Sequence, residues 1–297
     1  MRDLRFWNRS YRDLVPSQDV LHQLDIIILS AAVGMFLFAN TGGAALTGYA
    51  SAFGAGEFVF GLISALPILA SLVQLYVSYL IEKTGQRKKL FLIGGVIQRT
   101  AWVVVAFIPI LVPEFAASSR IWVLLTLITL AAMAGSFVNV SHVSMMAEVV
   151  PMEIRGRYIT TRQRTTTLFS LAAGLGAAFI LDHLPGYWGY TVVFGVGGLC
   201  GIADILLYTK FEFPQLPRNE RRFSLFEGAL GCFKDEKTRR FLVFWMVWGF
   251  GINLSSAFFN KYALEMLGLS FTQIILFGQI TSNLLSIFVL PRWGRCL

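Results

Sequence analysis

The positive charges of this chain fall almost entirely in alternate gaps between its apolar stretches. Eight hydrophobic spans can be drawn, at residues 26–49, 58–81, 90–112, 121–147, 165–181, 190–209, 241–259 and 271–290. The N-terminal segment, gaps 2–3, 4–5 and 6–7, and the tail hold four, four, four, eight and two Lys or Arg residues, which is 22 of the 25 in the chain. The intervening gaps hold Arg120 and Lys261 alone, and Arg99 lies inside a span. This alternation indicates a chain that crosses a membrane eight times.

The same distribution predicts an orientation. Cationic loops remain on the cytoplasmic side, so we expect a multi-pass protein of the cell membrane with a cytoplasmic N-terminus. Spans of about 20 apolar residues match a hydrocarbon core of about 30 Å. They must be helices, because lipid offers no partner to an unpaired backbone group. The predicted fold class is therefore an all-α polytopic membrane protein.

Composition agrees with this fold class and excludes several others. The chain is 56% hydrophobic and 14% charged, unlike a soluble domain. Its net charge of +8 follows from the loop bias, requires no nucleic-acid partner and would face anionic lipid headgroups. Cys200, Cys232 and Cys296 are odd in number and far apart in sequence, so they support neither a disulfide nor a metal site. No cofactor is predicted.

A long polar stretch divides the chain into three parts. Residues 1–210 form a six-helix bundle, 211–240 a cytoplasmic linker, and 241–297 a partial second bundle of two helices. Within the linker, residues 224–233 have the pattern of a short amphipathic helix, either lying on the membrane surface or tying the two bundles together.

An internal echo relates the first two spans to the last two. Four residues recur at an offset of 213: Asn40, Tyr49, Ala50 and Phe58 match Asn253, Tyr262, Ala263 and Phe271. Four identities in an apolar window are weak alone, but they agree with the helix count. Together they favour two parallel repeats of six helices, of which the second is incomplete.

Two of the cation-rich gaps carry a family resemblance. Residues 78–89 read SYLIEKTGQRKK, and residues 151–157 read PMEIRGR. The first is similar to the loop 2–3 motif of the major facilitator superfamily, with Ser78 in place of the usual Gly and Glu82-Lys83 in place of Asp-Arg. The second resembles that superfamily's short acidic-then-Arg-Gly loop. The resemblance covers essentially the whole chain but says nothing of the substrate.

The resemblance implies a secondary transporter of a small solute that works by alternating access, with the coupling ion, H⁺ included, left open. It also marks a gating motif of Ser78, Glu82, Lys83, Gly85, Arg87 and Lys88. Gly85 suits a tight turn because it tolerates positive φ, and Glu82 can accept charge-assisted hydrogen bonds from Arg or a helix N-terminus. The alternative is a topogenic basic loop with no gating role.

The chain departs from the family pattern by ending soon after its eighth span. A two-half transporter would need about four more helices. We therefore expect a transporter truncated after the eighth helix, and its rival is a non-transporting remnant or membrane scaffold. A membrane-embedded enzyme would need clustered catalytic groups near one interface. The outside gaps offer acids and one histidine in separate gaps, so no enzyme is predicted.

Charged and polar residues inside the spans are the candidate functional groups, because each is expensive in hydrocarbon. Arg99 and Asp204 are predicted to form an ion pair. Alternatively, Arg99 attracts an anionic substrate or Asp204 carries a proton. In the family fold, the first, fourth and seventh spans line a central cavity, and the second and eighth lie between the halves. The expected substrate pathway is Asn40, Gln74, Arg99, Asn139, His142, Asn253, Asn260, Gln279 and Asn283.

Overall fold

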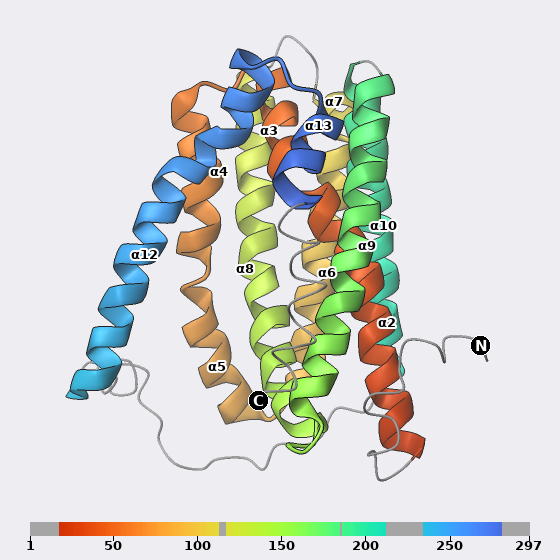
Figure 1. Ribbon diagram of the computed structural model, residues 1–297, viewed down its shortest axis with the longest axis vertical. Helices are drawn as coiled ribbons and strands as arrows, with labels where there is room; N and C mark the ends of the chain where they lie inside the picture. Colours follow the sequence, from red (N-terminus) through yellow and green to blue (C-terminus); the bar gives the residue numbers. More distant parts are fainter. Residues whose placement is uncertain (1–17, 113–116, 185, 212–233, 281–297) are drawn as a thin grey trace.

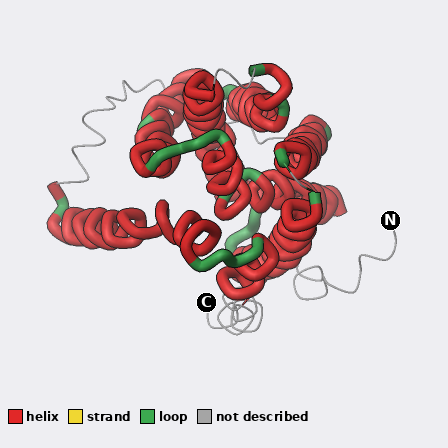
Figure 2. The backbone as a smooth tube through the Cα atoms, turned by 90° about the horizontal axis from the view of Figure 1, so that it is seen from above, coloured by secondary structure: helices red, strands yellow, loops and turns green. Residues whose placement is uncertain are grey.

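The structure, a computed structural model, describes residues 18–112, 117–184, 186–211 and 234–280. All regular secondary structure in these ranges is helical, with short loops between the helices (Figures 1 and 2). The helices are α2 (Gln18–Asn40), α3 (Gly43–Ala52), α4 (Glu57–Ala70), α5 (Val73–Thr84), α6 (Arg87–Ala106), α7 (Ile108–Leu111), α8 (Ala117–Val149), α9 (Arg155–His183), α10 (Tyr187–Thr209), α12 (Glu236–Lys261), η3 (Tyr262–Met266), α13 (Phe271–Ile275) and η4 (Leu276–Ile280).

Six helical stretches in the described residues are long and apolar enough to cross a membrane. They are Gln18–Ala52, Glu57–Thr84, Arg87–Ala106, Ser119–Val149, Arg155–His183 and Tyr187–Thr209. These stretches coincide with the first six predicted spans, and the all-α polytopic fold class is confirmed. The seventh span lies within α12. The eighth is described to residue 280, and the linker helix predicted at 224–233 lies outside the described residues.

The first two membrane-spanning stretches are each divided into two helices. α2 ends at Asn40 and α3 begins at Gly43, whose φ of 54° suits glycine. α4 contains Pro67, which lacks a backbone N–H, and the helix ends three residues later. Ser71 at this break donates a hydrogen bond of 2.6 Å to the carbonyl of Ile68. Neither break was predicted, because hydropathy continues across both.

The fifth helix begins ten residues before the predicted fifth span. We expected residues 155–164 to be a cationic loop because they contain four arginines, but α9 begins at Arg155. That boundary is wrong for a physical reason. Polar residues that face the interior of a bundle lower the hydropathy of a helix as much as a loop does.

Helices α2, α6, α8, α9 and α10 pack closely around two apolar clusters. One cluster lies toward the end with few cations and contains Tyr49, Phe53, Trp102 and Phe194. The other lies toward the cation-rich end and contains Leu24, Phe91, Met145, Tyr158 and Phe211. Between them, α2, α6 and α10 carry the buried polar residues Ser30, Arg99 and Asp204. A polar layer therefore crosses the middle of the bundle.

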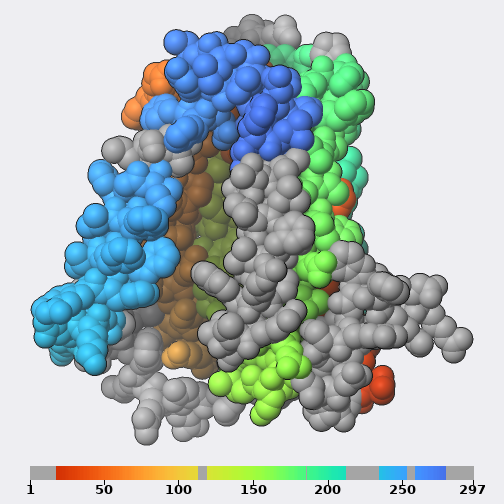
Figure 3. Space-filling view, viewed as in Figure 1, coloured from red at the N-terminus to blue at the C-terminus, as the bar shows by residue number. Residues whose placement is uncertain are grey.

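Helices α12 and α13 meet the six-helix bundle near the cation-poor end. α12 packs on α3 and α4, and α13 packs on α9 and α3. In Figure 1, α12 then slopes away from α5 toward the cation-rich end. Figure 3 shows a hollow beside α12, at the back of which α4 and α5 are visible in brown. We call the contacts of α12, η3 and α13 with the other helices the junction.

Candidate functional site: a polar cavity in the six-helix bundle

A cavity of about 660 Å³ opens in the middle of the six-helix bundle. It is walled by α2, α4, α5, α6, α8, α9 and α10, and the break between α4 and α5 lies on its wall at Ser71. Its polar lining residues are Ser30, Ser71, Gln74, Gln98, Arg99, Ser136, Asn139, His142, Arg162, Gln163, Thr166, Thr167, Ser170, Asp204 and Tyr208. A polar space of this size inside membrane-spanning helices is a candidate binding site for a small molecule.

Arg99 and Asp204 form a buried ion pair at one wall of the cavity. Arg99 Nη2 lies 2.8 Å from Asp204 Oδ2, with side chains 3% and 8% exposed. Ser30 Oγ donates to Asp204 Oδ1, and Arg99 Nη1 donates to Gln98 Oε1. The pair thus joins α6 to α10 and is supported from α2. Each charge therefore has an opposite charge and one further hydrogen bond as partners, while Arg99 Nε is buried without an acceptor.

Two glycines make room for this pair. A Cβ atom added at Gly34 would lie 2.9 Å from Asp204 Oδ2, and one added at Gly201 would lie 2.7 Å from Arg99 Cγ. Both distances are shorter than van der Waals contact. The absence of side chains on α2 and α10 at these positions therefore allows the ion pair to sit between tightly packed helices.

The structure brings several of the predicted pathway residues together and separates others from them. Gln74, Arg99, Asn139 and His142 all line the cavity. Asn40 is 4% exposed, lies outside the cavity lining, and donates from Nδ2 to the carbonyl of Val193 at 3.1 Å. Asn260 on α12 lines neither this cavity nor the second one described below. The side chains of Asn253 and Gln279, and the whole of Asn283, lie outside the described residues.

The cavity also contains residues that the sequence analysis missed. Arg162, Thr166 and Ser170 follow each other at intervals of four on α9, and all three line the cavity. This spacing is the signature of one face of a helix and was present in the sequence. The cluster of arginines before the apolar span predicts a loop at Arg162, whereas the structure places it on α9.

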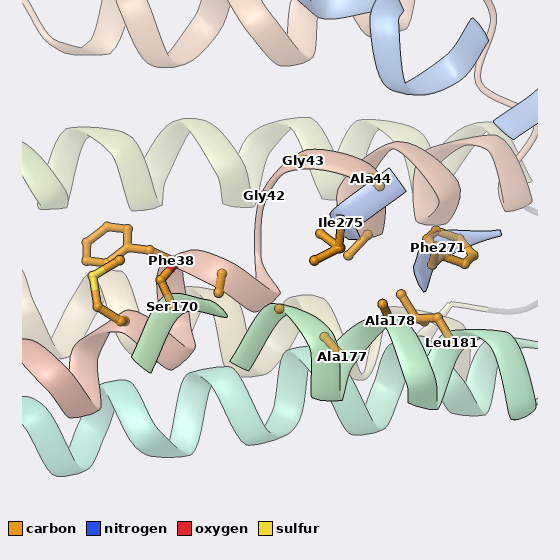
Figure 4. Close-up of a pocket in the computed structure, with 14 residues that line it drawn as sticks. Phe38, Gly42, Gly43, Ala44, Ser170, Ala177, Ala178, Leu181, Phe271 and Ile275 are labelled. Carbon is orange, nitrogen blue, oxygen red and sulfur yellow. The ribbon is translucent and has the colours of Figure 1, made fainter. Parts of the chain in front are cut away.

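A second cavity of about 210 Å³ continues from the first toward α13. The two share Met35, Phe38 and Ser170 as lining residues. In Figure 4, Phe38 and Ser170 lie at one end of this cavity, and Phe271 lies at the other beside Leu181. The α2–α3 break at Gly42 and Gly43 also lies on its wall. Helix α13 therefore borders the route from the polar cavity to the cation-poor end.

Polar contacts at the junction hold α12, η3 and α13 against the bundle. Asp182, at the end of α9, accepts hydrogen bonds of 2.9 Å from the backbone N–H groups of Phe271 and Thr272. Lys261 forms an ion pair with Glu57, and Ser51 Oγ donates to Glu265 at 2.7 Å. The Glu57 carboxylate raises the pKa of Lys261, which lies beyond the apolar part of α12.

Phe271 is the apolar contact of the junction. Its ring meets that of Tyr190 edge to face, with centroids 6.3 Å apart. A Cβ atom at Gly48 would lie 2.7 Å from Phe271 Cζ and 2.7 Å from the Tyr190 hydroxyl. The bare backbone of α3 therefore admits the Phe271 ring.

The predicted gating motif lies at the opposite, cation-rich end. Gly85 has φ 67° and closes α5 with a hydrogen bond of 2.8 Å from its N–H to the carbonyl of Ile81. Arg87 is 1% exposed; its Nη2 lies 2.7 Å from Glu148 Oε2 and its Nη1 donates to Ser144. Lys88 Nζ donates to carbonyls at the end of α10. Its acceptors are Thr209 at 2.9 Å and Phe211 at 2.8 Å.

The remaining motif residues make local contacts. Ser78 Oγ donates to the carbonyl of Gln74 at 2.9 Å, and the Lys83 ammonium lies 5.6 Å from the centre of the Tyr79 ring. Among the described residues, no cation forms an ion pair with Glu82. The contacts of Arg87 and Lys88 thus join α6 to α8 and α10 within the six-helix bundle, and the gating role of the motif stays a prediction.

At the same end, Asp235 caps the beginning of α12. It accepts hydrogen bonds from the backbone N–H of Thr238 at 2.8 Å and from its hydroxyl at 2.7 Å. These hydrogen bonds stabilise the carboxylate and lower the pKa of Asp235. The cap explains why α12 begins here, directly before the apolar residues of the seventh span.

The family comparison agrees with the helix count and with the polar cavity. The family model of the Major Facilitator Superfamily matches residues 27–296, which is most of the chain. The chain belongs to this superfamily. A search of curated proteins found no match.

Membership of the Major Facilitator Superfamily assigns the chain a general function. Proteins of this superfamily are transporters that carry small molecules across membranes. The chain is therefore a multi-pass membrane protein with a general transporter function. The six membrane-spanning stretches with a polar cavity between them fit that role.

Proposed function

We propose that this superfamily member is a secondary transporter that moves a small solute through the polar cavity by alternating access. The observation that carries the proposal is the position of α13. Phe271 and Ile275 border the second cavity, which continues from the polar one toward the cation-poor end. Movement of α13 away from α9 would open this route, while the polar cavity would remain as the binding site.

The kind of contact at the junction supports this motion. Glu57 is 72% exposed in its ion pair with Lys261, and Asp182 and Ser51 make their hydrogen bonds in exposed surroundings. Exposed ion pairs typically contribute about 0–1 kcal/mol each. Contacts of this strength can form in one state of a transport cycle and break in another.

The orientation and the division into halves belong to the same proposal. The cation-rich end faces the cytoplasm of the cell membrane, as the positive-inside rule favours. Residues 1–210 act as one body and 241–297 as part of a second, joined by the linker at 211–240. In this cycle the motif around Glu82 contacts the second body when the cytoplasmic end closes. Transport is either uncoupled or coupled to an ion such as H⁺.

The test is uptake that depends on the junction. Protein in proteoliposomes is offered a mixture of cell metabolites, and mass spectrometry identifies solutes that enter beyond those entering protein-free liposomes. A Glu57→Cys/Lys261→Cys variant, with Cys200, Cys232 and Cys296 replaced by Ser, is then joined by a reducible bis-thiol crosslinker. We expect the crosslink to stop uptake and a reductant to restore it.

Two controls and two adverse outcomes define the experiment. Each single-cysteine variant, treated with the same crosslinker, should transport normally. Undiminished uptake in the crosslinked protein would contradict opening at the junction. No uptake by the uncrosslinked, folded chain would favour the non-transporting scaffold instead.

A further inference from the structure

We propose that the polar cavity binds an anion at Arg162, and that the transported solute is therefore a small anion. The statement that the anion is transported rests on the proposed function. The anion site itself is argued from the charges of the cavity. Arg162 is on α9, on the same face as Thr166 and Ser170, and all three line the cavity.

The charge balance of the cavity points to an anion. Arg99, Asp204 and Arg162 are the residues with permanent charge among its lining residues. Arg99 and Asp204 neutralise each other at 2.8 Å, and Ser30 supports the carboxylate. Among the described residues that line the cavity, Arg162 therefore leaves one net positive charge.

Arg162 differs from Arg99 in having no partner among the described residues. No described side chain or carbonyl is hydrogen-bonded to it, and no described carboxylate lies within ion-pair distance. The Nε atoms of both arginines are buried without an acceptor, but Arg99 has a partner at each Nη atom and Arg162 has none among the described residues. A charged group that is buried without a partner is energetically unfavourable. Arginine stays protonated in proteins, so Arg162 cannot avoid this cost by losing its charge. A bound anion would supply the missing partner through paired hydrogen bonds to the guanidinium group.

The surroundings of Arg162 suit an oxyanion. Its charge acts on His142, Asp204 and Tyr208, which come from α8 and α10. Arg162 lines the cavity, and its Nε atom is buried. Hydroxyl and amide groups of Thr166, Ser170 and Asn139 line the same space and can donate hydrogen bonds to anion oxygens. We expect a carboxylate, phosphate or sulfate group on the solute.

The test measures the charge preference of the cavity directly. In a chain whose cysteines are replaced by Ser, Asn139→Cys introduces a thiol on the cavity wall, one helical turn before His142. The protein is placed in nanodiscs of phosphatidylcholine, which supply no anionic lipid. Rates of reaction with an anionic sulfonatoethyl and a cationic trimethylammonioethyl methanethiosulfonate are measured and divided by the rates with free 2-mercaptoethanol.

We expect the normalised anionic-to-cationic rate ratio to be about tenfold above that of the free thiol, because the reagents differ by two charges near one guanidinium. Arg162→Gln should lower the ratio about tenfold, and Arg162→Lys should largely retain it. Arg164→Gln is the matched control, since Arg164 is on the same helix but does not line the cavity. It should leave the ratio unchanged.

The outcomes separate the two proposals. A ratio equal to that of the free thiol in the Asn139→Cys protein, or no reaction with either reagent, would overturn the anion site even if Arg162→Gln fails to fold. A preference that survives Arg162→Gln would overturn the role of Arg162. An anion preference in a chain that takes up no solute would leave the site standing and sink the proposed function.

Discussion

The polar contacts inside the six-helix bundle differ in kind from the polar contacts at the junction. Inside the bundle, Arg99 and Asp204 are almost completely withdrawn from water and are fitted against bare helix backbone. At the junction, Glu57 and Lys261 form a half-exposed ion pair, with side chains 72% and 15% exposed. Breaking a buried pair leaves a charge without partner or solvent, whereas an exposed pair exchanges its contact for water. The bundle interior therefore depends on a buried ion pair, whereas the junction depends on polar contacts that are more exposed.

The largest expected effect comes from breaking the buried pair. Asp204→Ala should lower the free energy of unfolding by about 3–5 kcal/mol, because it leaves the Arg99 guanidinium buried without its carboxylate. Denaturation in bicelles, followed by circular dichroism, measures the change. The control is Arg99→Met/Asp204→Leu, which removes both charges and should lose less stability than Arg99→Met and Asp204→Leu lose in sum when each is made alone. A strictly additive result would contradict a stabilising pair.

The glycine beside the pair should give a smaller loss. Gly201→Ala places a Cβ atom 2.7 Å from Arg99 Cγ and should cost about 1–3 kcal/mol of unfolding free energy through overpacking. Gly195→Ala is the matched control on the same helix, since a Cβ atom there meets nothing within 4 Å. The two variants are compared in one denaturation series. Equal stability would show that α10 can shift without cost and would weaken the contrast between bundle and junction.

At the junction, removal of the Asp182 carboxylate, which supplements the Ser270 cap at the start of α13, should act locally. Asp182→Ala removes both acceptors for the N–H groups of Phe271 and Thr272 and should cost about 1 kcal/mol. Hydrogen exchange should speed up at these two amides with little change in the six-helix bundle. Asp182→Asn keeps one acceptor oxygen, so its exchange rates at these amides should fall between those of the parent chain and those of Asp182→Ala. Equal acceleration throughout α9 would mean that the junction is not a separate unit.

The smallest effect is expected for the surface pair. Lys261→Gln should change stability by less than about 1 kcal/mol, and added salt should abolish the difference from the parent chain. Arg240→Gln breaks the exposed pair with Glu236 inside α12 and serves as a control that does not cross the junction. Thermal denaturation at low and high salt compares the two. A large loss of stability in Lys261→Gln would show that the junction pair contributes as much to folding as the buried pair in the bundle does.

Hydropathy and charge alternation were sufficient to predict the six membrane-spanning stretches, because these follow from the apolar composition of each span. They also singled out Arg99 and Asp204 as charges inside spans, although their contact depends on packing between α6 and α10. The amide of Asn40 was predicted in the pathway but contacts Val193, since the direction of a side chain depends on which helix lies beside it. Arg162 was misplaced because a cavity and a loop both favour polar residues.

The contact of Lys88 with the end of α10 has a mechanical consequence. Its hydrogen bonds to the carbonyls of Thr209 and Phe211 attach the first residue of the linker to the start of α6. Phe211 is also fully buried, so this residue is fixed to the six-helix bundle. In the proposed transport cycle, a displacement of α12 would therefore have to be accommodated by the linker residues that follow Phe211.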